Sequence, residues 1–229
     1  MTTTTTELRF LASASSGEVS ALLERPDAAR SILVFGHGAG AGMRHHFMED
    51  AASALAVRGV ATFRYQFPYV EKGQFRPDPQ PILVATVRSA VAAAREAAGD
   101  LPMLAGGKSM GGRMTSLAAS KEALPGVQGL VFFGFPLHPA GAPSIERAAH
   151  LDRVTVPMLF LAGTRDKLAD LDLLCPVIDR LGGKATLHVL EGADHSFEVL
   201  KRTGRTAADV LVELAQTADT WAQTLEAKK

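Results

Sequence analysis

One glycine-rich segment of the chain has the composition of a catalytic turn: Gly106-Gly107-Lys108-Ser109-Met110-Gly111-Gly112-Arg113. It follows a short apolar run at residues 103–105 and precedes a helical pattern. The spacing Gly107-x-Ser109-x-Gly111 fits a sharp strand-to-helix turn that leaves a serine hydroxyl exposed. Glycines are needed there because larger side chains would collide with adjacent backbone, and the helix directs its first amides at a developing negative charge. The segment therefore predicts a nucleophile at Ser109.

A serine hydroxyl is a weak nucleophile, so it needs a general base and an acid that orients the base. On a turn of this kind the partners follow the serine in the order acid, then histidine. Asp166 lies just past the apolar run at 158–162, and His195 lies just past the run at 185–190. We therefore predict that Ser109, Asp166 and His195 form a catalytic triad.

Neighbouring residues offer alternatives to two of these assignments. An aspartate after a strand is often only a helix cap, and Asp170 and Asp172 lie close enough to replace Asp166 as the acid. Asp194 adjoins His195, but adjacent side chains in extended backbone point apart. His188 alternates within its own predicted strand, which favours a structural role.

A second glycine-rich segment supplies candidate oxyanion donors: Phe35-Gly36-His37-Gly38-Ala39-Gly40-Ala41-Gly42. Acyl transfer needs two backbone N–H groups directed at the tetrahedral oxygen, one from the residue after the nucleophile and one from such a loop. The predicted donors are Met110 and Ala39, with Gly38 as a loop glycine and Gly107 and Gly111 as turn glycines. Removing one donor of this kind typically costs about 3 kcal/mol of transition-state stabilisation.

Both glycine segments also resemble nucleotide-binding motifs. Gly107-Lys108-Ser109 ends like a phosphate-binding loop, but Pro102 occupies the position of the first glycine that this motif needs. The 36–41 segment satisfies G-x-G-x-x-G/A, and Arg64 follows the next apolar run, as a site for NADP would require. The helix after this loop starts too late to bind a pyrophosphate. The adjacent His45 and His46 suggest a solvated helix start rather than a metal site, so no cofactor and no metal are expected.

Alternating strands and helices are predicted to position these residues. Such an alternation demands crossover connections, hence one doubly wound, mostly parallel sheet with helices on both faces and ligands beyond the carboxyl ends of the strands. A single domain is expected over residues 7–229, with an antiparallel hairpin at one edge (8–12 and 19–23) and a frayed threonine-rich terminus at 1–6. The expected strands are 31–35, 60–64, 103–105, 127–133, 158–162 and 185–190, and the expected helices are 47–58, 81–98, 110–121, 168–181 and 207–225.

Composition limits the class of protein. The 229 residues carry 24 Lys+Arg against 24 Asp+Glu, and this balance provides no basic field for nucleic acid or an anionic membrane. A single cysteine, Cys175, excludes an internal disulfide framework. The start of the chain lacks the basic and apolar features of a secretory signal, and apolar runs are shorter than the ~20 residues that span a bilayer. We expect a cytoplasmic globular protein, monomeric or homodimeric, without nucleic-acid or membrane partners.

Taken together, these stretches resemble the α/β-hydrolase superfamily over nearly the whole chain. They are more narrowly similar to its KANL3/Tex30-like branch, which is close to the dienelactone-hydrolase type. The resemblance rests on the two glycine segments, Phe63-Arg64-Tyr65-Gln66-Phe67-Pro68-Tyr69, Pro136-Leu137-His138-Pro139, Gly163-Thr164-Arg165-Asp166 and Asp194-His195-Ser196-Phe197. It implies an eight-stranded sheet, the nucleophile turn after the fifth strand, and Ser109, Asp166 and His195 as the triad. Dienelactone hydrolases use a cysteine nucleophile, whereas this chain has a serine.

The predicted activity is hydrolysis of small-molecule esters or thioesters through an acyl-enzyme. Only residues 134–152 separate two strands where many relatives insert a cap, which predicts an open cleft that suits short acyl chains. The residues expected at its rim, with the core as the other possibility, are Phe67, Tyr69, Phe135, Leu137 and His138. Lys108 and Arg113 flank the turn, suggesting either an acidic substrate group or a surface salt bridge. An acyltransferase or peptidase on the same triad, or a non-catalytic interaction module, remains an alternative.

Overall fold

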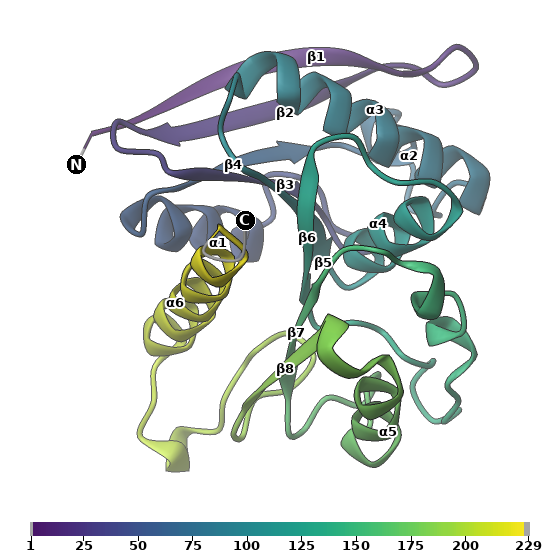
Figure 1. Ribbon diagram of the computed structural model, residues 1–229, viewed down its shortest axis with the longest axis vertical. Helices are drawn as coiled ribbons and strands as arrows, with labels where there is room; N and C mark the ends of the chain where they lie inside the picture. Colours follow the sequence, from purple (N-terminus) through teal and green to yellow (C-terminus); the bar gives the residue numbers. More distant parts are fainter. Residues whose placement is uncertain (1, 227–229) are drawn as a thin grey trace.

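The computed structural model describes residues 2–226 and builds them around one eight-stranded sheet (Figure 1). The strand order across the sheet is β1-β2-β4-β3-β5-β6-β7-β8. The pairs β1–β2 and β2–β4 are antiparallel, and all the other neighbouring strands pair parallel. Their bounds are β1 (Thr3–Ser13), β2 (Gly17–Pro26), β3 (Ser31–Gly36), β4 (Val60–Tyr65), β5 (Met103–Lys108), β6 (Val127–Phe133), β7 (Met158–Gly163) and β8 (Ala185–Leu190).

The threonine run corrects the expectation of a frayed terminus at residues 1–6. Thr3 to Thr6 are the first residues of β1 and pair antiparallel with β2, from Thr3 opposite Pro26 to Thr6 opposite Leu23. Threonine is β-branched and fits a pleated, solvent-facing strand, so an all-threonine run extends the hairpin without any apolar alternation that would have marked it. Met1 lies outside the described residues.

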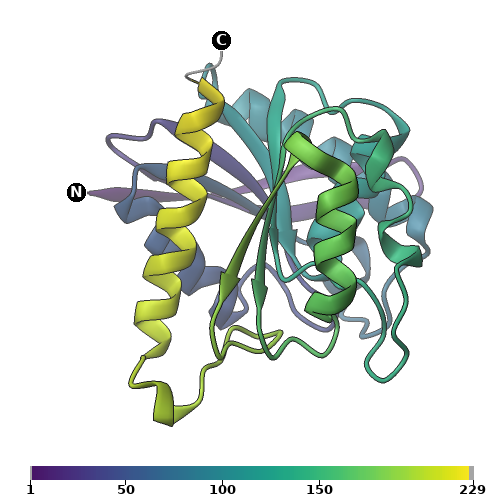
Figure 2. The ribbon, with the colours of Figure 1, turned by 60° about the horizontal axis from the view of Figure 1, so that its bottom comes forward.

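Helices cover both faces of the sheet, as the alternating pattern predicts. One face packs against α3 (Gln80–Ala98), α4 (Met110–Lys121) and α5 (Leu171–Leu181), and the other packs against α1 (His46–Val57) and α6 (Ala207–Glu226). Figure 2 shows α5 and α6 on opposite sides of the strands. Strands β3, β4, β6 and β7 are nearly or fully buried because each faces helices on both sides.

Two further differences from the predicted elements fall near the carboxyl ends of strands. β5 continues through Gly106, Gly107 and Lys108, where the sequence predicted a glycine loop after residue 105. A Cβ at Gly106 would lie 1.9 Å from the carbonyl oxygen of Val131, so glycine here allows close packing of neighbouring strands. A short helix that the sequence did not predict, α2 (Pro68–Glu71), begins the irregular stretch after β4.

The connection from β6 to β7 is short and holds two single-turn 3-10 helices, η1 (Glu146–Ala148) and η2 (Leu151–Arg153). It contributes Leu151 and Val154 to the core. The fold is therefore the predicted mostly parallel sheet with little more than a loop where a cap domain would be inserted. Within residues 2–226, no helix is both long and apolar enough to cross a membrane.

Candidate functional site

The turn between β5 and α4 holds Ser109 in a backbone conformation that residues other than glycine seldom adopt. Its φ is 50° and its ψ is −114°, and the only other described residue with a side chain at positive φ is Phe197. Such a conformation costs about 1–3 kcal/mol and persists only where the surroundings enforce it. The amide of Ser109 donates to the carbonyl of Phe133 at 3.1 Å, which ties the turn to β6.

Glycines at this turn permit backbone-to-backbone contact with the end of β3. A Cβ at Gly107 would lie 2.3 Å from the carbonyl oxygen of Gly36, and a Cβ at Gly111 would lie 2.2 Å from the same atom. Real Cβ contacts are essentially never shorter than 3.0 Å. The two glycines predicted from the motif are therefore required by packing, and they bring the loop after β3 against the start of α4.

Ser109, His195 and Asp166 lie in one hydrogen-bonded chain. His195 Nε2 is 2.9 Å from Ser109 Oγ, and His195 Nδ1 is 2.8 Å from Asp166 Oδ2. The side chain of Asp166 is 1% exposed and that of His195 is 21% exposed, so the carboxylate is buried while the imidazole edge reaches the cleft. The structure thus brings together the three residues that the sequence nominated, from the ends of three separate strands.

The alternative acids occupy other positions. Asp170 caps α5, because its carboxylate accepts the amide of Asp172 at 3.0 Å. The second oxygen of Asp166 accepts the amide of Leu168 at 2.8 Å, which fixes the carboxylate toward His195. Asp194 points away from the imidazole and accepts the amides of Ser196 and Glu198 at 2.9 and 3.0 Å. Asp194 therefore builds the turn that carries His195, and Asp166 contacts the ring.

The loop after β3 is held by a buried histidine. The Nδ1–H of His37 donates to the carbonyl of Gly38 at 2.8 Å, and its Nε2 accepts the amide of Phe67 at 3.2 Å. Burial lowers the pKa of His37 to about 4, so the ring is neutral at physiological pH, as its accepting nitrogen requires. A Cβ at Gly38 would lie 3.7 Å from Ser109 Cβ, so this loop lies directly against the turn. Ala39 is exposed at the cleft, and Met110 opens α4 on the other side of Ser109.

A cleft of about 400 Å³ opens over Ser109 and His195. One wall is the start of α1, with His45, Phe47 and Met48, and another includes Leu168 and Glu198. The sequence placed α1 after the predicted oxyanion loop but did not identify its first turn as a wall. Helix order was the available signal, because the first turn of a helix that follows such a loop must lie beside the strand ends.

The residues expected at the rim are core instead. Phe67, Tyr69 and Leu137 have no exposed surface, and Phe135 and His138 are 2% and 3% exposed. Phe67 packs edge-on against His37 with ring centroids 5.0 Å apart, while His138 accepts the amide of Asp170. These five side chains belong to the core, and the cleft walls come from the start of α1 and from Leu168 and Glu198.

Neither flanking charge forms a salt bridge among the described residues, and Lys108 lines the cleft. Lys108 Nζ donates to the backbone carbonyl of His195 at 2.5 Å, with no surface carboxylate as its partner. Arg113 does not line the cleft. His45 caps α1 by accepting the amide of Phe47 at 3.3 Å, as a helix start would, and the described residues contain no cluster of three metal-ligating side chains. His188 pairs with Glu213 at 2.7 Å, in keeping with a structural role.

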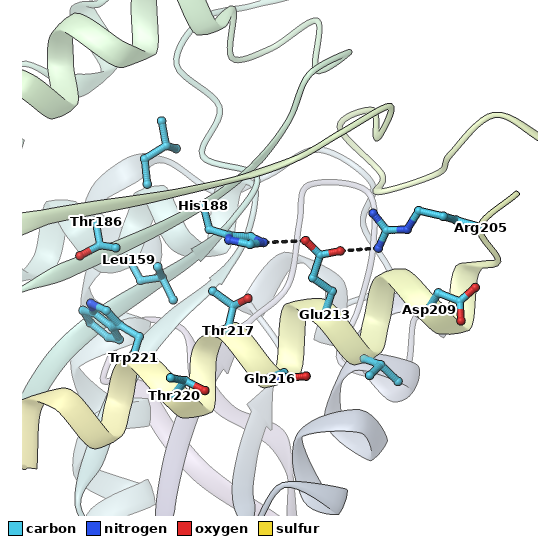
Figure 3. Close-up of a pocket in the computed structure, with 12 residues that line it drawn as sticks. Leu159, Thr186, His188, Arg205, Asp209, Glu213, Gln216, Thr217, Thr220 and Trp221 are labelled. Atoms are coloured by element: carbon cyan, nitrogen blue, oxygen red, sulfur yellow. Dashed lines mark hydrogen bonds and ion pairs between the residues drawn. The ribbon is translucent and has the colours of Figure 1, made fainter. Parts of the chain in front are cut away.

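That pair lies in a second, larger hollow between β8 and α6, shown in Figure 3. Glu213 reaches His188 on one side and Arg205 on the other, so the imidazole is engaged by a carboxylate and not by a hydroxyl. The hollow is about 580 Å³ and remote from Ser109. The candidate site is therefore defined by the hydrogen-bonded chain Ser109–His195–Asp166 and not by the size of a hollow.

Comparison with known proteins agrees with this architecture. A family model described as an alpha/beta hydrolase domain matches residues 29–223. The chain therefore belongs to the α/β-hydrolase family of enzymes. The narrower KANL3/Tex30-like branch stays a prediction.

Solved structures share the fold over almost the full length. A dienelactone hydrolase from Anabaena variabilis superposes with a TM-score of 0.72 at 21% identity, covering 96% of this chain and 98% of that one. An α/β serine hydrolase without lid from Xanthomonas campestris gives 0.72 at 20% identity, covering 96% of each chain. An α/β serine hydrolase homologue from Coxiella burnetii gives 0.71 at 21% identity, covering 90% of this chain and 96% of that one. At these identities the likeness shows the fold.

Proposed function

We propose that the protein is a serine hydrolase that cleaves small carboxylic esters or thioesters through an acyl-enzyme. The observation that carries the proposal is the chain of hydrogen bonds from Ser109 Oγ through the His195 imidazole to the buried Asp166 carboxylate, at 2.9 and 2.8 Å. This arrangement has the distances and the order that proton transfer from a serine hydroxyl requires. The esterases and serine hydrolases among proteins of the same fold add support.

Acylation begins at the hydroxyl of Ser109. Ser109 Oγ attacks the carbonyl carbon while its proton moves to His195 Nε2, and Asp166 stabilises the resulting imidazolium. The amides of Met110 and Ala39 donate to the oxyanion. The tetrahedral intermediate then collapses, the bond to the alcohol or thiol breaks, and this leaving group takes the proton from His195. Ser109 is left as an ester of the acyl group.

Deacylation repeats these steps with water. Water gives a proton to His195 Nε2 as its oxygen attacks the acyl carbon, and the same two amides again hold the oxyanion. Ser109 then leaves, recovers the proton from His195, and the carboxylic acid is released. The substrate, water and these side chains supply every proton that moves, and no other reactant takes part.

The cleft favours short acyl groups. Its volume of about 400 Å³ is at the lower end of the ~300–1,000 Å³ of small-molecule sites. The side chains of Phe47, Met48 and Leu168 give it apolar walls. We expect p-nitrophenyl butyrate to be hydrolysed with a kcat/KM at least tenfold above that of the palmitate ester, and the reverse preference would contradict this view of the cleft.

A fluorophosphonate probe tests the proposed nucleophile directly, because it phosphonylates an activated serine. The wild type is expected to be labelled and to hydrolyse p-nitrophenyl butyrate, whereas Ser109→Ala is expected to do neither. Ser120→Ala is the matched control, since Ser120 lies on the same helix and its hydroxyl donates only to the Leu117 carbonyl. Equal labelling of wild type and Ser109→Ala would reject the proposal and favour a non-catalytic interaction module.

A further inference from the structure

Beside the Ser109–His195–Asp166 chain lies an ammonium group that the mechanism above does not use. Lys108 is the last residue of β5 and directly precedes Ser109. Its Nζ donates to the backbone carbonyl oxygen of His195 at 2.5 Å, across 87 residues of sequence. Lys108, which precedes the predicted nucleophile, is thus hydrogen-bonded to the backbone of His195, the predicted base.

Two aromatic rings enclose the same ammonium. Phe47 and Phe197 stack with their centroids 5.7 Å apart and an interplanar angle of 16°. Lys108 Nζ lies 5.6 Å from the Phe47 centroid and 5.3 Å from the Phe197 centroid, within the ~6 Å range of cation–π attraction. Phe197 follows His195 by two residues, so Lys108 contacts the turn that carries the imidazole at two points.

The backbone of that turn is strained at the residue that faces Lys108. Phe197 has a φ of 65°, a left-handed conformation that an aromatic residue rarely adopts and that costs about 1–3 kcal/mol. Asp194 enforces it by accepting the amides of Ser196 and Glu198 and by its carbonyl, which accepts the amide of Phe197 at 3.0 Å. In this conformation the Phe197 ring is 4% exposed and lies next to the ammonium.

Gly134, in the loop after β6, leaves room for this arrangement. A Cβ at Gly134 would lie 3.2 Å from Lys108 Nζ and 3.4 Å from both Cε1 and Nδ1 of His195. The ammonium and the imidazole therefore pass within contact distance of the same small volume. The ammonium is thus held by one carbonyl and two aromatic rings and lies close to the imidazole.

We propose that Lys108 is a positioning residue that holds the turn carrying His195 at the distance where Nε2 can accept the proton of Ser109. The inference rests on the proposed function of this site. Lys108 lines the cleft, but its ammonium is held by the His195 carbonyl and lies against two aromatic rings. These partners favour a role in the geometry of the base over the binding of an acidic substrate group.

The environment of the ammonium adds a pH dependence. Burial lowers the pKa of Lys108 to about 8, against the opposing attraction of Asp166 and Asp194. The imidazoles of His195 and His45 also lie near it, and His46 and Glu198 line the same cleft. Above pH 8 the neutral amine retains a hydrogen-bond donor but loses the charge that strengthens the bond to the carbonyl and the attraction to the rings. The turn is held less firmly as this proton is lost.

The first experiment compares Lys108→Met with Lys121→Met, an exposed lysine at the far end of α4 that serves as the control. For Lys108→Met we expect kcat on p-nitrophenyl butyrate to fall about 10- to 100-fold, the range that a misplacement of up to an ångström produces, with KM changed less than about threefold. Lys121→Met should match the wild type. An unchanged kcat, or a raised KM at constant kcat, would overturn the inference.

The second experiment needs no loss-of-charge variant and so holds even if Lys108→Met does not fold. The kcat of the wild type is expected to decline above about pH 8, and Lys108→Arg, which stays charged, is expected to keep its kcat to higher pH. A wild-type kcat that stays level from pH 8 to pH 10 would refute the role of Lys108. Fluorophosphonate labelling of Ser109 in the same samples separates this failure from a failure of the proposed function, since labelling persists in the first case and is absent in the second.

Discussion

Replacing Gly111 by alanine tests how closely the nucleophile turn and the loop after β3 are packed. An alanine Cβ at this position would lie 2.2 Å from the carbonyl oxygen and 2.4 Å from the carbonyl carbon of Gly36, and 2.8 Å from the carbonyl oxygen of His37. Contacts below 3.0 Å essentially do not occur, so the two backbones must separate by about 0.8 Å. No side-chain rotation relieves the clash, because all three atoms belong to the main chain.

Two quantities are expected to change. Overpacking of this kind costs about 1–3 kcal/mol in the free energy of unfolding, although helix propensity alone would make alanine about 1 kcal/mol more favourable than glycine. The separation also moves the proposed donors Met110 and Ala39 apart, and a displacement near 1 Å lowers kcat by about 100-fold. Urea unfolding measures the first quantity, and turnover of p-nitrophenyl butyrate measures the second.

Gly183→Ala is the control, because a Cβ there meets no atom within 4 Å. It should leave stability and turnover close to those of the wild type. A Gly111→Ala protein that is as stable as the wild type and retains its kcat would show that the contact between β3 and α4 is loose and does not set the position of the amide donors.

Three further predictions follow from buried polar groups. Asp166→Asn should lower kcat about 10³- to 10⁴-fold with the fold retained, because the amide no longer stabilises the imidazolium. Steady-state kinetics measures kcat, circular dichroism checks the fold, and a loss of kcat below tenfold would contradict the prediction. Glu24→Ala should lower the free energy of unfolding in urea by about 3–5 kcal/mol, because it leaves the guanidinium of Arg64 buried (4% exposed side chain) without the carboxylate that lies 2.9 Å away. Asp152→Ala breaks an exposed pair with Arg180 and should lower it by less than about 1 kcal/mol. His150 is buried, with Nε2 2.7 Å from Ser116 Oγ, and burial lowers its pKa to about 4. The folded protein therefore binds a proton at His150 less readily than the unfolded chain does. The resulting contribution to the free energy of unfolding, about 3 kcal/mol, is complete above pH 6.5 and is lost as the pH falls toward 4. His150→Gln should flatten unfolding free energy against pH in that window, and an unchanged slope would refute the assignment.

Much of the candidate site was accessible from sequence because its residues follow strand ends in order. Ser109, Asp166 and His195 each come directly after an apolar run, and parallel strands bring their carboxyl ends to one edge of the sheet. The glycines of the turn were identifiable for the same reason, since only a close backbone approach requires them. Strand order and helix sides then follow from the crossover connections.

Other features were hidden because they depend on which way side chains point after a strand ends. Phe67 and Leu137 have the composition of a cleft rim and of a core alike, and only the path of the loop buries them. The partner of Lys108 is a backbone carbonyl, which carries no residue-type signal. The threonine run at the start of β1 gave no alternation by which a strand is recognised.

The contact between Gly36 and the two turn glycines, Gly107 and Gly111, divides the site into a part that tolerates few substitutions and a part that tolerates more. The positions of the proposed nucleophile and of both proposed amide donors are set by main-chain atoms in contact, which exchange of side chains elsewhere does not alter. The cleft walls, by contrast, consist largely of side chains, such as His45 and Met48 at the start of α1 and Leu168 on another wall. Substitutions there are free to reshape the space for an acyl or alcohol group while the reacting atoms stay in register. A protein built in this way can change its substrate preference through single substitutions in the cleft walls while the reacting groups keep their positions.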